Sequence, residues 1–354
     1  MHCDLFRDIK TLTGPEVLYS FHVDDRWMYF VGEDHEIGSV SNHTHVVDVI
    51  CSQKERLMLL SEHGTEEVIE SAASTSNIGC PLKALARKYI YEPSAVSQHI
   101  RFLCDIRRDA PYCILGILYE FTSYLYLYKR DVVRTQALYK TFFEIAKHFE
   151  KRAIDSFRDR KNTKAFFLRL FHPDKTLPKW FISYCEALGH PTGDHEIKKR
   201  LKTLKETEPH VYKNIANYIE SELDYRLMDV KIYTPVMASV AQKRHTASLH
   251  FALTKSQHVS TFFTSLFGLL LEINLLVHIY TEKHDNIVVF TGSAHSYNLA
   301  KFLKMSSYDE ENSYSIHRNP MGYLDFKDKK YMMLQNPLLS PLSLLKNTVS
   351  GTGK

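Results

Sequence analysis

Two segments far apart in the chain place a histidine three residues after a glycine. Each glycine ends a short run of β-branched or aromatic residues, which is the composition of a buried strand. In α/β proteins the loops that follow the carboxyl ends of the strands carry the reactive side chains. We therefore expect both histidines to belong to one site. The two motifs are Gly32-Glu33-Asp34-His35 and Gly292-Ser293-Ala294-His295.

Two further apolar runs also end in residues that can take part in chemistry. The run over 56–60 is followed by Glu62, and the run over 99–104 by Asp105 and Arg107. Because the carboxyl ends of parallel strands meet at one edge of a sheet, we expect these side chains near the two histidines. Arg107 would then stabilise an anionic group of the substrate or transition state. The alternative is that Asp105 and Arg107 form only an ion pair at the sheet edge.

Carboxylates combined with imidazoles suit two kinds of chemistry. In the first, His35, Glu62 and His295 would bind a divalent metal such as Mn²⁺, Zn²⁺ or Co²⁺. In the second, Glu33 orients His35 for proton transfer without a metal, since side chains 33 and 35 share a face of an extended segment. Both alternatives place the chemistry at the carboxyl edge of the sheet. The candidate catalytic residues are Glu33, His35, Glu62, Asp105, Arg107 and His295.

The segments that carry these residues predict an α/β fold with a mostly parallel sheet flanked by helices. Residues 27–31 and 56–60 have the length and composition of buried strands, and residues 39–51 between them predict a crossover helix. Such a βαβ unit is almost always right-handed. A strand over 286–290 followed by a helix over 295–305 predicts a second strand–helix pair near the end of the chain.

The middle of the chain has a different character. Apolar residues recur at helical spacing from 112 to 160, and helical and basic stretches alternate from 179 to 226. The basic run over 198–202 predicts a solvated helix face, with a nucleic-acid or anion-binding surface as the alternative. We therefore expect a first part of the α/β core, a largely helical insertion or cap, a last part of the core and a flexible tail. These comprise residues 1–110, 111–255, 256–336 and 337–354.

Composition limits the class of protein. The net charge of +4 gives no strong signal for a nucleic-acid partner. The six cysteines show no C-x-x-C pair, and most lie in apolar surroundings, which favours reduced thiols in a soluble, intracellular protein. We expect no signal peptide at the start of the sequence.

The apolar stretch 262–280 contains Glu272, Asn274 and His278, so it predicts a buried helix with a polar stripe rather than a membrane span.

The motifs resemble those of the erythromycin esterase, ChaN and Tiki group of α/β proteins. That group has an early Gly-x-x-His or Gly-Glu-x-His, an acidic residue at the end of the next strand, and a later Gly-x-x-His. The matching residues here are 32–35, Glu62 and 292–295. The chain also resembles uncharacterised proteins of large nucleocytoplasmic DNA viruses, whose Asp-Ile-Arg motif matches residues 105–107.

The penultimate helix of these viral proteins carries an Asp, an aromatic residue and an Arg. At the corresponding place this chain has Glu272, Asn274 and His278, so it departs from the pattern there. The resemblance implies hydrolysis of a small-molecule or peptide substrate (an ester, peptide or phosphoester), with or without a metal. Two alternatives stay open: a non-catalytic viral virion or host-interaction protein on the same scaffold, and a haem- or metal-binding protein with His35 or His295 as ligand.

Overall fold

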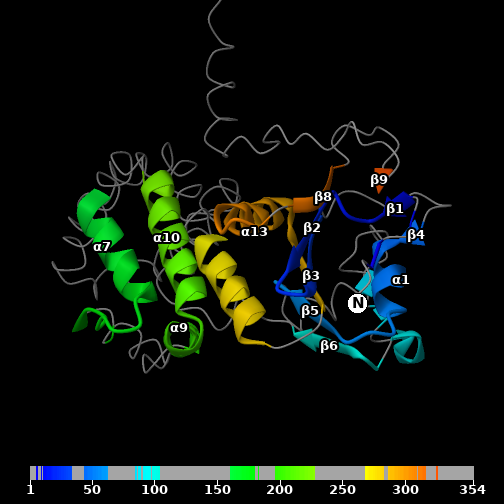
Figure 1. Cartoon of the computed structure of the whole chain (residues 1–354), viewed down its shortest axis with the longest axis horizontal. Coiled ribbons are helices and arrows are strands. Elements are labelled where there is room, and N and C mark those ends of the chain that lie inside the picture. Colours follow the sequence, from blue (N-terminus) through cyan, green and yellow to red (C-terminus); the bar gives the residue numbers. More distant parts are fainter. Residues whose placement is uncertain are drawn as a thin grey trace, which may run out of the picture. The chain divides into compact units, whose positions relative to one another are not determined.

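The chain divides into two compact units in the computed structural model (Figure 1). The first unit comprises Met1–Arg108 and His278–Lys354, and the second comprises Asp109–Val277. Each unit is described by itself. The structure describes residues 5–6, 9, 11–33, 44–62, 84–85, 87–88, 91–96, 98–103, 160–179, 182, 196–227, 268–282, 286–308, 310–315 and 324–325.

The first unit is built on a six-stranded mixed sheet. Its strands are β2 (Val17–Val23), β3 (Arg26–Glu33), β5 (Leu57–Ser61), β6 (Ile100–Leu103), β7 (Asn286–Gly292) and β8 (Glu310–Ser315). They lie in the order β6-β5-β7-β3-β2-β8. Strands β6, β5, β7 and β3 run parallel to one another, whereas β2 pairs antiparallel with both β3 and β8. The predicted α/β fold with a mostly parallel sheet is therefore confirmed, and an antiparallel edge is added to it.

Strand β2 and its turn into β3 were not predicted from the sequence. The two strands pair in continuous register from Val17 opposite Gly32 to Val23 opposite Arg26. Asp24 and Asp25 form the turn with φ values of 48° and 64°. Two consecutive residues with positive φ form a tight turn whose twist matches that of the two strands it connects. Aspartate tolerates this conformation better than most residues.

Helices cover both faces of the sheet. Alternation along β3 places Tyr29 and Val31 on one face, in a core cluster with the residues of α1 (Val46–Cys51). Gly32 lies on the other face, where α13 (Ser293–Met305) packs against β2, β3 and β7 (Figure 1). Helix α1 is shorter than the helix predicted over 39–51. It begins after His45, whose Nδ1 accepts a hydrogen bond from the backbone N–H of Val47 at 3.2 Å.

Residues before α1 belong to a second, small sheet. Strands β1 (Thr11–Thr13), β4 (Thr44–His45) and β9 (Leu324–Asp325) lie in the order β4-β1-β9. Strand β4 pairs parallel with β1, and β9 pairs antiparallel with it. The N-terminal part of the predicted crossover therefore leads through a short strand into the helix.

The described part of the second unit is helical. It contains α7 (Arg160–Phe171), α9 (Glu196–Thr207), α10 (Pro209–Arg226) and residues 268–277 of a helix that is described over 268–281. That last helix confirms the expectation for the apolar stretch: Glu272, Asn274 and His278 are all buried. Within the described residues, no helix is long and apolar enough to cross a membrane.

Candidate functional site

The two glycine motifs begin at neighbouring strand ends. Strands β3 and β7 are adjacent and parallel, with Gly32 opposite Thr291 and Glu33 opposite Gly292. Strand β5 pairs with β7 on its other side, with Ser61 opposite Phe290. The three strands are parallel and end at nearly the same register, so their carboxyl ends lie at one edge of the sheet. Neighbouring strands are separated by about 4.8 Å. The topology thus brings together the segments that the sequence analysis selected.

Glu62 and His295 both lie beside Gly292. The Glu62 carboxylate accepts a hydrogen bond from the Gly292 backbone N–H at 3.3 Å, and the Glu62 N–H donates to the Phe290 carbonyl at 3.2 Å. The Glu62 side chain is therefore tied to the end of β7, and the residue is only 3 % exposed. A methyl group built at Gly292 would lie 3.9 Å from Cδ2 of His295, so the imidazole folds back towards the same residue.

Helix α13 begins directly at this edge, two residues earlier than predicted. Gly292 is its N-cap in an extended conformation, which places His295 in the first helical turn, partly buried. The backbone N–H groups of a first turn lack partners within the helix and carry a partial positive charge. The Glu62 carboxylate on Gly292 therefore lies at the favourable end of the helix dipole.

Two residues to which the sequence analysis assigned no role, Glu16 and Ser293, complete this edge. The Ser293 hydroxyl donates a hydrogen bond to a carboxylate oxygen of Glu16 and lies 3.4 Å from the backbone carbonyl of Glu33. The Glu16 N–H donates to the Gly32 carbonyl at 2.8 Å, so Glu16 is held at the end of β3. Glu16 and Glu33 are 5 % and 4 % exposed. The only sequence signal for Glu16 is its place directly before an apolar run.

Gly32 permits the close packing of α13 on β3. A methyl group at this position would lie 2.4 Å from Cγ2 of Val17, 2.7 Å from Cα of Ser293 and 3.1 Å from Oγ of Ser296. These distances are shorter than van der Waals contact, so the helix could not approach a strand that carried a side chain here. The glycine of the first motif thus positions the first turn of the helix that contains the second motif.

Three of the predicted site residues, His35, Asp105 and Arg107, lie outside the described residues. The proposed proximity of His35 to His295, and the role of the Asp105–Arg107 pair, therefore stay predictions. Within the described part of the chain, no group of three or more His, Cys, Asp or Glu residues is arranged to hold a metal ion.

The second unit contains a buried cluster of charged residues. The Glu272 carboxylate accepts hydrogen bonds from Tyr218 at 2.9 Å and from Arg226 at 2.7 Å, and Arg226 also donates to Glu222 at 3.1 Å. Burial by itself would lower the pKa of Arg226, but Glu272 and Glu222 raise it, so the guanidinium stays charged. Burial, followed by the charge of Glu272, raises the pKa of Tyr218. The predicted buried helix thus turns Glu272 towards polar partners, as expected.

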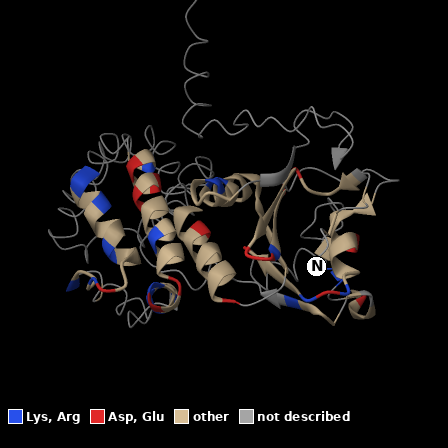
Figure 2. Cartoon of the chain, viewed as in Figure 1, with Lys and Arg blue, Asp and Glu red and all other residues tan. Residues whose placement is uncertain are grey.

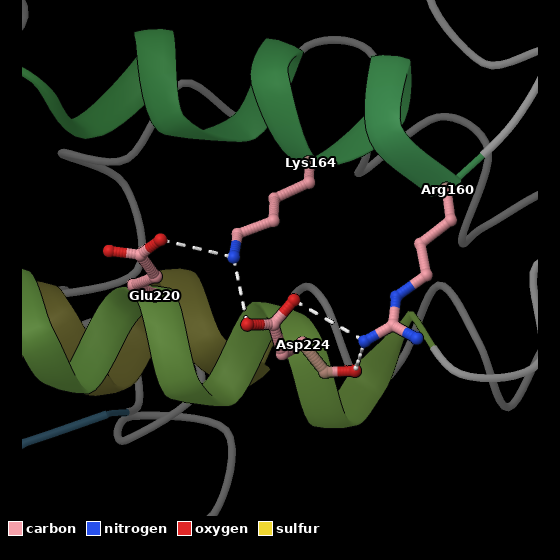
Figure 3. A network of polar contacts seen from close by, with 4 residues as sticks. All are labelled: Arg160, Lys164, Glu220 and Asp224. Atoms are coloured by element: carbon pink, nitrogen blue, oxygen red, sulfur yellow. Dashed lines mark hydrogen bonds and ion pairs between the residues drawn. The ribbon is translucent and has the colours of Figure 1, made fainter.

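A surface network joins α7 to α10 (Figure 3). Lys164 contacts Glu220 at 3.2 Å and Asp224 at 2.8 Å, and Arg160 contacts Asp224 at 3.3 Å. The hydrogen bond to Asp224 raises the pKa of Lys164, and that from Lys164 lowers the pKa of Asp224. Figure 2 marks Lys and Arg positions along the ribbon of α7 and Asp and Glu positions along the ribbon of α10. The positive charges of Arg160 and Lys164 are therefore paired with carboxylates of the same unit.

No protein-family model, curated protein or solved structure matches the chain. The resemblance to the erythromycin esterase, ChaN and Tiki group therefore rests on the motifs alone.

Proposed function

We propose that the chain is a hydrolase whose site lies at the carboxyl edge of β3, β5 and β7. The observation that supports this most is that the Glu62 carboxylate, from the end of β5, is hydrogen-bonded to the N-cap of the helix whose first turn carries His295. A carboxylate beside an imidazole is a common arrangement for general acid–base catalysis, because the imidazole can transfer a proton near neutral pH. The substrate would be an ester, a peptide or a phosphoester.

The roles follow from the positions of the residues. His295 is partly buried and would transfer protons, while Glu62 is fixed by Gly292 and would orient and stabilise the imidazolium. Glu33 would act with His35 from the neighbouring strand end. Arg107, oriented by Asp105, would bind the oxyanion of the transition state.

A divalent cation would act at the same edge. In this alternative His35, Glu62 and His295 would bind Mn²⁺, Zn²⁺ or Co²⁺, and the ion would polarise the substrate and activate water. Elemental analysis of the purified protein distinguishes the two forms of the proposal. About one equivalent of metal that copurifies, with activity lost on chelation and restored by that metal, supports the metal-assisted form.

The proposed function is tested by turnover of a panel of carboxylic esters, peptides and phosphoesters. For Glu62→Gln and for His295→Ala we expect a loss of about 10²-fold or more in kcat/KM. Glu220→Gln and His210→Ala are matched controls, because both residues are exposed in the second unit, and they should leave turnover unchanged. A wild-type protein that hydrolyses no member of the panel, or site variants as active as the controls, would contradict the proposal.

A further inference from the structure

We propose that Ser293 is a nucleophile of this site and that Glu16 is its general base. Hydrolysis of a carboxylic ester would then pass through a covalent acyl ester of Ser293. This inference rests on the proposed hydrolase function and adds to it a substrate class, an acyl compound, and a covalent intermediate. Glu16 lies outside the motifs that led to the site, and Ser293 follows the glycine of the second motif but received no role from the sequence.

The first support is the hydrogen bond between the two side chains. Ser293 is the first residue of α13, and its hydroxyl donates to a carboxylate oxygen of Glu16. Its other polar neighbour, the carbonyl of Glu33, lies at 3.4 Å, so the carboxylate is the closer acceptor of the hydroxyl proton. A base in direct contact with the hydroxyl is the arrangement that activates a serine nucleophile.

The second support is that Ser293 does not serve its helix as a cap. A serine at the N-cap position ordinarily accepts a hydrogen bond from a backbone N–H of the first turn. Here the N-cap is Gly292, and the Ser293 hydroxyl is instead directed to a carboxylate contributed by a residue 277 positions away in the chain. Helix formation alone therefore does not explain this contact.

The third support is the position of the pair in the fold. Ser293 follows β7 immediately, at the strand end where Glu62 and His295 approach Gly292. The backbone N–H groups of the first turn of α13 carry partial positive charge, which would stabilise the oxyanion formed when the hydroxyl attacks a carbonyl. The hydrogen bond from Glu16 N–H to the Gly32 carbonyl holds the base in place.

The chemical steps balance without a further reactant except water. The Ser293 oxygen bonds to the acyl carbon while its proton passes to Glu16, and the tetrahedral intermediate expels the alcohol, which takes that proton from Glu16. Water then attacks the acyl ester and gives a proton to Glu16. Collapse of the second intermediate releases the carboxylic acid, and Glu16 returns the proton to the Ser293 oxygen.

Ser296 provides a matched control on the same helix. Its hydroxyl is 2.8 Å from the Thr291 hydroxyl, and both residues are fully buried, whereas Ser293 is 9 % exposed. A probe that reacts with an activated serine should therefore distinguish Ser293 from Ser296. The Ser296→Ala variant removes a hydroxyl close to Ser293 without touching the proposed pair.

The experiment is labelling of the full chain with a fluorophosphonate, followed by intact mass measurement and peptide mapping. In this reaction the serine oxygen bonds to phosphorus, fluoride leaves, and Glu16 takes the proton. We expect one adduct on Ser293, no adduct in Ser293→Ala, an unchanged rate in Ser296→Ala, and a rate about 10²-fold lower in Glu16→Gln. Melting temperatures of all variants verify that they are folded.

Several results would overturn this inference. The folded wild-type protein could stay unlabelled, or the adduct could form on another residue and persist in Ser293→Ala. A labelling rate that Glu16→Gln leaves unchanged would also overturn it. Ester turnover retained in Ser293→Ala, or turnover restricted to phosphoesters, would also overturn the inference while leaving the proposed hydrolase intact. No turnover on any substrate would contradict the proposed function itself.

Discussion

Replacing Gly32 by alanine should disturb the fold far more than the same change at Gly292, although both glycines open a Gly-x-x-His motif. At position 32 the added methyl group would lie 2.4 Å from Cγ2 of Val17 and 2.7 Å from Cα of Ser293. The second of these atoms belongs to the backbone, so rotation of a side chain cannot relieve the contact. At position 292 the nearest atom, Cδ2 of His295, is 3.9 Å away, which is an ordinary contact.

The expected magnitudes follow from these distances. Forcing a methyl group into a packed interior typically costs about 1–3 kcal/mol, and the backbone clash places Gly32→Ala at or above the upper end of this range. In a domain of about 150–250 residues a cost of about 3 kcal/mol corresponds to a fall in melting temperature of about 6–12 °C. Gly292→Ala exchanges one N-cap residue for a poorer one in a conformation that alanine adopts readily, so we expect a cost below about 1 kcal/mol.

Thermal and denaturant unfolding followed by circular dichroism measures both variants. The account also predicts that Gly32→Ala reduces any activity of the site, because the methyl group displaces the helix that carries Ser293 and His295. A melting temperature of Gly32→Ala within about 1 °C of the wild type would refute the reasoning, since about 1 kcal/mol shifts it by 2–4 °C. A greater loss of stability in Gly292→Ala would refute it as well.

Two further predictions concern buried groups away from the site. Burial raises the pKa of the Cys51 thiol to about 11, so at pH 8 its reaction with a disulfide reagent should be much slower in the folded protein than in denaturant; equal rates would contradict its burial. Glu272→Ala would leave Arg226 buried without its closest carboxylate, which should lower the free energy of unfolding by about 3–5 kcal/mol. Its exposed counterpart Glu220→Ala should cost less than about 1 kcal/mol in the same denaturant titration.

The strands that carry the site could be predicted because the sheet buries both of their faces. Residues 27–31, 57–60 and 287–290 are continuous apolar runs, which is the pattern of parallel strands covered by helices on both sides. Strand β8 is polar throughout, since it lies at the sheet edge, and β2 carries Ser20 and His22 within its apolar run. Neither pattern is specific enough to identify a strand in a single sequence.

The residues of the candidate site could be predicted where they follow a strand directly. They could not be predicted where their contact depends on the packing of distant segments. Glu62 and His295 each follow a recognisable strand, so their approach to one residue could be expected. The contact between Glu16 and Ser293 joins positions 277 residues apart, and nothing in the local sequence of either residue indicates the other. It depends on the close packing of α13 on β3, which requires the absence of a side chain at Gly32.

A double-mutant cycle between Glu62 and His295 tests the central claim most directly. The claim is that these two residues act together at the end of β7, so the effects of removing them should not be independent. With kcat/KM for the preferred substrate as the readout, we predict that Glu62→Gln combined with His295→Ala loses no more activity than the more damaging single change. Losses that multiply, as expected for residues in separate sites, would contradict the account.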